Sequence, residues 1–129
     1  SYEMNLMKLV EELRLENNFK FLGSVPNLFD IYCQYDYLLQ PTHMECFSLA
    51  ILESLSANVP VITTPVGGNK EVIFSAKNGY ILPVQNPKKW SVMLEKIYTG
   101  EEKIITNTTD LIVNEFSIEK MVVNYLKLL

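Results

Sequence analysis

The most informative stretch of this sequence is Glu45-Cys46-Phe47-Ser48-Leu49-Ala50-Ile51-Leu52-Glu53. It stands between two short apolar segments, Tyr37-Leu38-Leu39 and Val59-Pro60-Val61-Ile62-Thr63, which have the composition of buried strands. From Phe47 onward the stretch is apolar enough for a buried helix. Glu45 therefore lies in the loop before the helix, and Glu53 lies about two turns inside it. Strand, loop, helix and strand in this order predict a parallel α/β unit.

The rest of the chain repeats this alternation. We expect further strands at residues 19–22 and 80–82, and helices at residues 2–14, 26–34, 47–57, 69–74, 87–98 and 104–115, with a last helix after Ser117. The predicted fold class is α/β, a Rossmann-like parallel sheet with flanking helices. A chain of 129 residues is expected to form one domain with one core.

Local signals mark several of the expected helix ends. Asn58 stands where a left-handed residue would end a helix, and Asn69 stands where a side chain would cap the next one. Ser117 is expected to cap the last helix, with Phe116 and Met121 as a hydrophobic staple across its start. The face of helix 87–98 that we expect in the core carries Trp90, Met93, Leu94 and Ile97.

Composition narrows the classes of partner. A formal net charge of −4 argues against nucleic acid, which requires a basic surface. No apolar run approaches the roughly 20 residues of a membrane span, and no signal peptide is visible. Cys33 and Cys46 are too few for a disulfide framework, so we expect a cytoplasmic protein. With His43 as the single histidine, we expect no metal site.

The loops after the expected strands point to an anionic ligand that also carries hydroxyl groups. In parallel sheets, ligands bind beyond the carboxyl ends of the strands, where segments 23–25, 41–46 and 63–69 all lie. The helix start between Glu45 and Glu53 supplies free backbone N–H groups and the positive end of a helix dipole. Two carboxylates flanking an anion site suit a nucleotide-diphosphate sugar, which has hydroxyls on both sides of its pyrophosphate.

Five sequence elements in this order resemble a known family. They are Pro41-Thr42, Glu45-Cys46-Phe47-Ser48, the second carboxylate Glu53, Asn58-Val59-Pro60-Val61 and Gly67-Gly68-Asn69-Lys70-Glu71. The segments Phe21-Leu22-Gly23 and Phe116-Ser117 also fall where the family has similar residues. The chain resembles the C-terminal, donor-binding domain of the retaining GT-B glycosyltransferases of family four, the glycosyl transferases group 1. The resemblance covers nearly the whole chain.

The resemblance implies a role for each matching position. It implies that Glu45 is catalytic, near the hydroxyls of the donor sugar, and that Glu53 accepts hydrogen bonds from the ribose. The other donor-binding positions that it implies are Phe47, Ser48 and Leu49 at the phosphates, Gly67 and Gly68 in the loop after the third strand, and Ser24 and Val25 near the base. Enzymes of this family retain the anomeric configuration and use no metal and no cofactor.

The family pattern also includes parts that this sequence does not contain. The Arg and Lys that neutralise the pyrophosphate lie on an earlier β-α-β unit, and the acceptor binds to an N-terminal domain. We therefore expect residues 1–129 to be an incomplete C-terminal half of a GT-B fold, without sugar transfer of its own. The expected partners are a nucleotide-diphosphate sugar and an acceptor that is a glycan, a lipid or a polysaccharide precursor. Peripheral membrane association of the full-length enzyme is left open.

Departures from the family leave alternatives open. Cys46 and Ser48 replace glycines, so close backbone approach to a phosphate is less free. Cys46 and His43 have the residue types of a nucleophile and its base, but no third group orients them. A sugar-nucleotide epimerase of GT-B architecture is a second hypothesis, although it requires acid and base residues that this sequence scarcely supplies. A non-catalytic binding module is the third.

Overall fold

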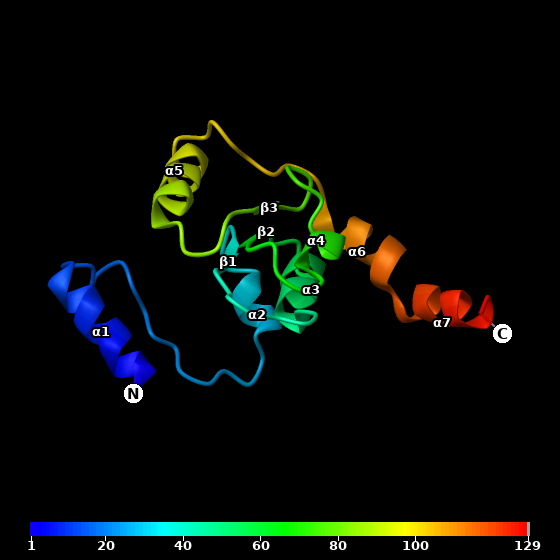
Figure 1. Cartoon of the computed structure of the whole chain (residues 1–129), viewed down its shortest axis with the longest axis horizontal. Helices are drawn as coiled ribbons and strands as arrows, with labels where there is room; N and C mark the ends of the chain where they lie inside the picture. Colours follow the sequence, from blue (N-terminus) through cyan, green and yellow to red (C-terminus); the bar gives the residue numbers. More distant parts are fainter. Residues whose placement is uncertain (129) are drawn as a thin grey trace.

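The centre of the molecule is a small parallel sheet. The computed structural model describes residues 1–128, and in it three strands lie in the order β1 (Leu38–Gln40), β2 (Val61–Thr63) and β3 (Gly79–Ile81) (Figure 1). Leu38 pairs with Val61, and Val61 pairs with Gly79, so the strands run in register and end at one edge. The predicted parallel α/β fold is confirmed.

Helices flank the sheet and extend beyond it. In the described part of the chain they are α1 (Tyr2–Glu12), α2 (Phe29–Tyr32), α3 (Leu49–Ser56), α4 (Asn69–Val72), α5 (Pro87–Tyr98), α6 (Thr108–Phe116) and α7 (Ile118–Leu126). Figure 1 shows α1 at one end of the molecule and α7 at the other. Neither of these two helices has a buried residue. Among residues 1–128, no helix has the length and apolar character needed to cross a membrane.

The core has two layers because alternate residues of β2 point to opposite faces of the sheet. Val61 packs on one face against side chains of α3, α4 and α6. Ile62 packs on the other face, where α5 contributes Trp90, Met93 and Ile97. Leu94, which the sequence places on the same helix face, is instead 39% exposed. The central strand is thus buried on both sides, as its continuous apolar sequence indicates.

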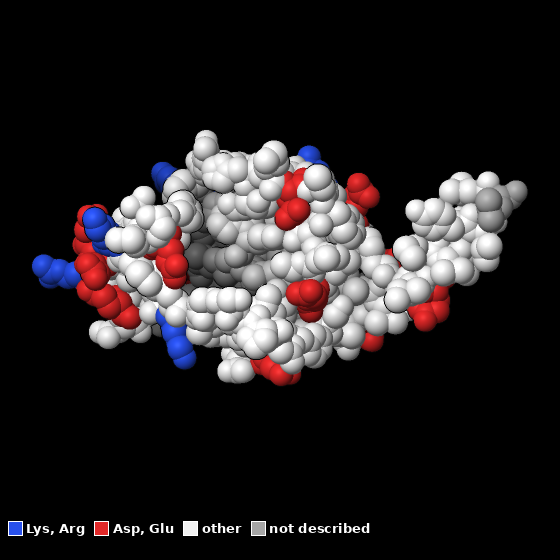
Figure 2. Space-filling view, turned by 90° about the horizontal axis from the view of Figure 1, so that it is seen from below, with Lys and Arg blue, Asp and Glu red and all other residues white. Residues whose placement is uncertain are grey.

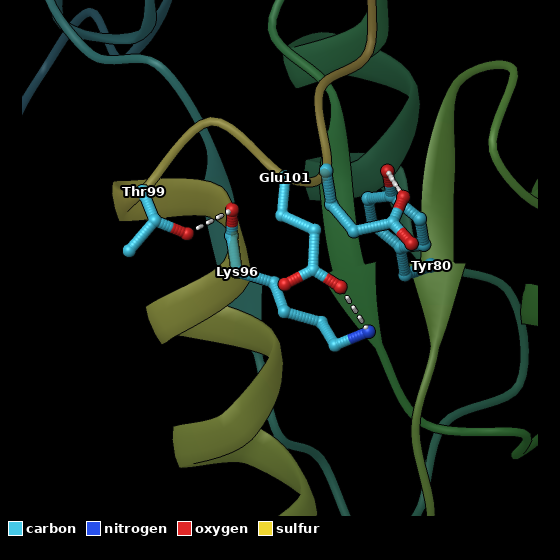
Figure 3. A network of polar contacts seen from close by, with 5 residues as sticks. Tyr80, Lys96, Thr99 and Glu101 are labelled. Carbon is cyan, nitrogen blue, oxygen red and sulfur yellow. Dashed lines mark hydrogen bonds and ion pairs between the residues drawn. The ribbon is translucent and has the colours of Figure 1, made fainter.

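Polar contacts hold the segment between α5 and α6 against the sheet (Figure 3). The Tyr80 hydroxyl donates to Glu102 Oε2 at 3.0 Å. The Ile104 N–H donates to the Tyr37 hydroxyl at 3.1 Å. Burial, the hydrogen bond to Glu102 and the charge of that carboxylate raise the pKa of Tyr80 to about 12.

The prediction of a strand at residues 19–22 is wrong. These residues form no strand and pair with no described strand, and Phe19, Phe21 and Leu22 are all exposed. A strand requires a neighbour that accepts and donates its backbone hydrogen bonds, and apolar composition does not supply that neighbour.

The start of α4 also differs from the prediction. Gly68 is the N-cap, and Asn69 is the first helical residue and not the cap. The Asn69 side chain is 1% exposed and points inward, where its amide donates to Thr63 Oγ1 at 3.0 Å and to the Thr64 carbonyl at 3.1 Å. Because the buried amide of Asn69 is bonded to Thr63 and Thr64, this side chain does not cap α4.

At the C-terminal end, the helix expected from residue 104 begins later. Asn107 caps α6, and Ile104 packs on the sheet instead of joining the helix. The left-handed residue Asn58, with φ of 60°, and the cap Ser117 are confirmed. Phe116 and Met121 line one cavity, in keeping with a staple between them.

Candidate functional site

The loops that follow the three strands meet at the carboxyl edge of the sheet. The Thr64 hydroxyl, after β2, donates to the Thr42 carbonyl, after β1, at 2.6 Å. Gln85 Nε2, after β3, lies 3.5 Å from His43 Nδ1. Two of the three segments expected at this edge, residues 41–46 and 63–69, therefore follow strands, whereas segment 23–25 follows no described strand.

A pair of glycines packs directly on the backbone that precedes α3. The Gly68 N–H donates to the Cys46 carbonyl at 2.8 Å. Gly67 has a φ of +51°, and a Cβ on it would overlap the Glu45 carbonyl oxygen. A Cβ on Gly68 would lie 2.7 Å from the Phe47 ring. Only glycines fit here, so the loop at Gly67 and the loop at Glu45 form one continuous surface.

Helix α3 begins beside this surface. Its N-cap is Ser48, whose Oγ accepts the Ile51 N–H at 3.4 Å and lies 2.9 Å from Gln40 Nε2. Ser48 is only 6% exposed, so its hydroxyl is turned inward. The N–H groups of Leu49 and Ala50 have no acceptor among the described residues. These two groups are available to an anion at the positive end of the helix dipole.

The two predicted carboxylates lie on either side of the helix start. Glu45 is half-buried in the loop, and its Oε1 accepts the Cys46 N–H at 3.1 Å. Glu53 is exposed on α3. Neither carboxylate forms an ion pair with a residue of the described chain. Both can accept hydrogen bonds from a ligand.

Glu53 also shares a cavity with the loop that the sequence assigned to the base. The cavity has a volume of about 300 Å³ and is lined by Glu53 and residues 25–29. Burial and the negative charge of Glu53 raise the pKa of the Tyr32 phenol behind it. The structure thus brings Val25 and Glu53 together, whereas Ser24 does not line this cavity.

A second cavity offers cationic side chains along α5, and it is also lined by Leu82, the residue that follows β3. It lies along α5, has a volume of about 410 Å³, and contains Lys88, Lys89 and Lys96 around the apolar side chains of Val92 and Met93. Lys96 is already paired with Glu101 at 2.8 Å (Figure 3). This cavity is the rival location for an anionic ligand.

The polar residues that join the loops from within were not predicted from the sequence. Gln40, Thr63 and Asn69 connect the ends of β1 and β2 to the starts of α3 and α4. The available signal was a polar residue at the last position of two otherwise apolar strands. Within residues 1–128, no three histidine, cysteine, aspartate or glutamate side chains gather into a group that could hold a metal ion.

Solved glycosyltransferase structures share this fold. The structure of Anabaena HepE in complex with UDP matches 99% of this chain and 37% of that chain, with a TM-score of 0.87 and 22% identity. The C-terminal domain of the glycosyl transferase group 1 protein LpcC from Francisella tularensis matches 91% of this chain and 63% of that chain, with a TM-score of 0.77 and 24% identity. The fold is therefore the Rossmann-like fold of a GT-B glycosyltransferase.

The family can be stated more narrowly. Residues 1–109 match the family described as Glycosyl transferases group 1, and the chain belongs to this family. The N-acetyl-alpha-D-glucosaminyl L-malate synthase of Bacillus anthracis is 35% identical over 79 residues, which are 61% of this chain and 21% of that protein. The chain spans about a fifth of the length of this curated relative. The predicted resemblance to the glycosyl transferases group 1 is confirmed.

Proposed function

We propose that this chain binds the donor of a sugar-transfer reaction, a nucleotide-diphosphate sugar, through the loops at the carboxyl edge of its sheet. The reaction is transfer of the sugar, with retention of configuration, to an acceptor held by a separate N-terminal domain. The observation that carries the proposal is the packing of Gly67 and Gly68 on the backbone of Glu45 and Cys46. This packing supports a single site in which the Glu45 carboxylate, the backbone of Gly67 and Gly68 and the start of α3 contact one ligand.

The phosphates are assigned to backbone N–H groups. In the proposed complex the amides of Phe47, Ser48 and Leu49 face the pyrophosphate, and Gly67 and Gly68 lie beside it, packed on Glu45 and Phe47. The N–H group of Leu49, which has no acceptor among the described residues, supports this assignment, and the N–H group of Ala50 is also available at the start of α3. Fixed dipoles aimed at the phosphates stabilise the departing nucleotide diphosphate, which is the main electrostatic contribution to such a reaction.

The hydroxyl groups are assigned to the carboxylates. In our proposal Glu45 accepts hydrogen bonds from the donor sugar, and Glu53 accepts them from the ribose. The base then lies near Ser24 and Val25. The cavity that Glu53 and Val25 line together supports the last two assignments, because ribose and base are adjacent in a nucleotide.

UDP is the first ligand to test, since the HepE structure similar to this chain is described as a complex with UDP. The chain has a net charge of −4, and backbone dipoles alone must offset the desolvation of the phosphates. We therefore expect a dissociation constant of about 1 mM, and no tighter, for the chain by itself.

The test is a chemical-shift titration of the chain with UDP. A hydrogen bond to a charged acceptor contributes about 1.5–3 kcal/mol, so Glu53→Ala should weaken UDP binding about tenfold to a hundredfold. Glu119→Ala is the matched control, because Glu119 lies in the first turn of α7, outside the proposed site. Equal affinities for the wild-type chain and Glu53→Ala would remove Glu53 from the ribose site. If the wild-type chain bound no UDP at a concentration of about 20 mM, which is 20-fold the expected dissociation constant, the proposed function would be contradicted.

A further inference from the structure

Gln40 is the last residue of β1, and its side chain contacts Ser48, the N-cap residue of α3. Its side-chain amide approaches Ser48 Oγ through Nε2 at 2.9 Å and through Oε1 at 3.2 Å. The same Oγ accepts the Ile51 N–H at 3.4 Å. The hydroxyl of the N-cap residue Ser48 therefore forms hydrogen bonds both to the Gln40 side chain and to the first turn of the helix.

The backbone of Gln40 is fixed as well. Its carbonyl accepts a hydrogen bond from Thr63 Oγ1 at 3.0 Å, and Thr63 Oγ1 accepts one from Asn69 Nδ2 at 3.0 Å. Thr63 is fully buried and Asn69 is 1% exposed, so these bonds are shielded from water. Gln40 thus stands where the ends of β1 and β2 meet the starts of α3 and α4.

We propose that Gln40 is a positioning residue for the anion site at the start of α3, an inference that rests on the proposed function. Gln40 holds the Ser48 hydroxyl against the Ile51 N–H, which directs the first turn of the helix. The N–H groups of Leu49 and Ala50 then remain free and aimed away from the helix. The Ser48 hydroxyl itself is occupied by Gln40 and is not a donor to the ligand.

A double-mutant cycle tests whether Gln40 acts through Ser48. Gln40→Met keeps the length of the side chain and removes its hydrogen bonds, and Ser48→Ala removes the cap. One lost hydrogen bond predicts that Gln40→Met weakens binding of UDP and of inorganic pyrophosphate about threefold to tenfold. It should also accelerate hydrogen exchange of the Ile51 amide by a similar factor. In the Ser48→Ala background, Gln40→Met should have no further effect on either quantity.

The control is Gln34→Met, which removes an exposed glutamine amide bonded only to the Asp30 carbonyl, at 2.9 Å. It should change neither the affinity for pyrophosphate nor the exchange of the Ile51 amide. If Gln40→Met does not fold, Gln40→Asn is the second variant, since its amide is too short to reach Ser48.

Three results would overturn the inference. Additive effects of Gln40→Met and Ser48→Ala would show that the two residues act separately. An unchanged Ile51 amide would show that Gln40 does not hold the cap. A loss of stability with unchanged ligand affinity would make Gln40 merely structural. If the wild-type chain bound neither UDP nor pyrophosphate, the proposed function would fail first, and exchange of the Ile51 amide would still decide whether Gln40 acts on the cap.

Discussion

At the scale of single residues, the candidate site depends on a left-handed glycine that has no room for a side chain. Gly67 has a φ of +51° and no room for a Cβ beside the Glu45 carbonyl. Gly23 has a similar φ of +65°, but nothing lies within 4 Å of its Cβ position. Substitutions of these two glycines therefore distinguish the energetic cost of a left-handed conformation from that of steric overlap.

We predict that Gly67→Ala lowers the free energy of unfolding by about 2–4 kcal/mol, because strain and overlap add. Gly23→Ala should cost only about 1 kcal/mol, since it incurs the conformational strain alone. Urea unfolding followed by circular dichroism measures both. Equal losses would show that the loop at Gly67 relaxes away from Glu45.

The two carboxylates should differ in the part of the ligand that they sense. Glu45 is assigned to the sugar, so Glu45→Ala should leave the affinity for UDP within about twofold and reduce the affinity for UDP-glucose about tenfold. Comparative titrations of the variant with both ligands measure the difference. A parallel loss of affinity for UDP and UDP-glucose would mean that Glu45 contacts the nucleotide.

At the scale of elements, β3 and the segment before α6 are joined by a titratable contact. The folded chain keeps the Tyr80 phenol protonated up to a pKa of about 12, whereas an unfolded tyrosine loses its proton near a pH of about 10. The unfolded state therefore binds fewer protons above that pH. The contribution of Tyr80 to stability is fully present below a pH of about 10 and is lost as the pH rises towards 12.

We predict that the free energy of unfolding falls more steeply with pH between about 10 and 12 in the wild-type chain than in Tyr80→Phe. Tyr98→Phe is the control, because Tyr98 is 93% exposed and should leave the slope unchanged. Urea unfolding at a series of pH values provides the slopes. The same slope in wild type and Tyr80→Phe would show that folding does not raise the pKa of Tyr80.

At the scale of the whole molecule, the outer edge of β1 is open. The Leu38 N–H donates to the Pro60 carbonyl of the neighbouring strand segment at 3.0 Å, so the N–H of Leu39 faces the opposite, outer edge of β1. No described strand pairs with that edge. A cavity of about 680 Å³ lies beside it, lined by Leu39 and residues of α5. Figure 2 shows a hollow between the end of the molecule that carries α1 and its main body.

An open strand edge invites pairing with another chain, so we predict that the chain self-associates as its concentration rises. Leu39→Lys should weaken this association on the order of tenfold, because a charge on the edge opposes pairing. Val113→Lys adds the same charge to an exposed apolar position on α6 and should have little effect. Sedimentation velocity measures the association. A monomeric wild-type chain at millimolar concentration would contradict the prediction.

Much of the fold follows from sequence because its signals are local. The apolar runs around Val61 and Leu38, the helix expected at residues 47–57 and the left-handed Asn58 each depend on a few neighbouring residues, although α3 spans only Leu49–Ser56. The segment at residues 19–22 has the same kind of local signal but no pairing partner, and a partner is not a local property.

The candidate site divides in the same way. The order of the strands placed the loops of Glu45 and Gly67 at one edge, as the sequence indicated. The contact of Gln40 with Ser48 and the inward turn of Asn69 could not be predicted, since each depends on side chains brought together by the folded sheet. The assignment of ligand groups to these residues stays a prediction.

The central claim is that a nucleotide-diphosphate sugar binds at the carboxyl edge of the sheet, and intermolecular nuclear Overhauser effects between UDP and the chain test it most directly. The cavity shared by Val25 and Glu53 and the cavity along α5 both contain a valine, so methyl protons report on each location. We predict contacts from the base protons of UDP to the methyl groups of Val25, and none to those of Val92. Contacts to Val92, with none to Val25, would place the nucleotide among the lysines of α5 and contradict the account.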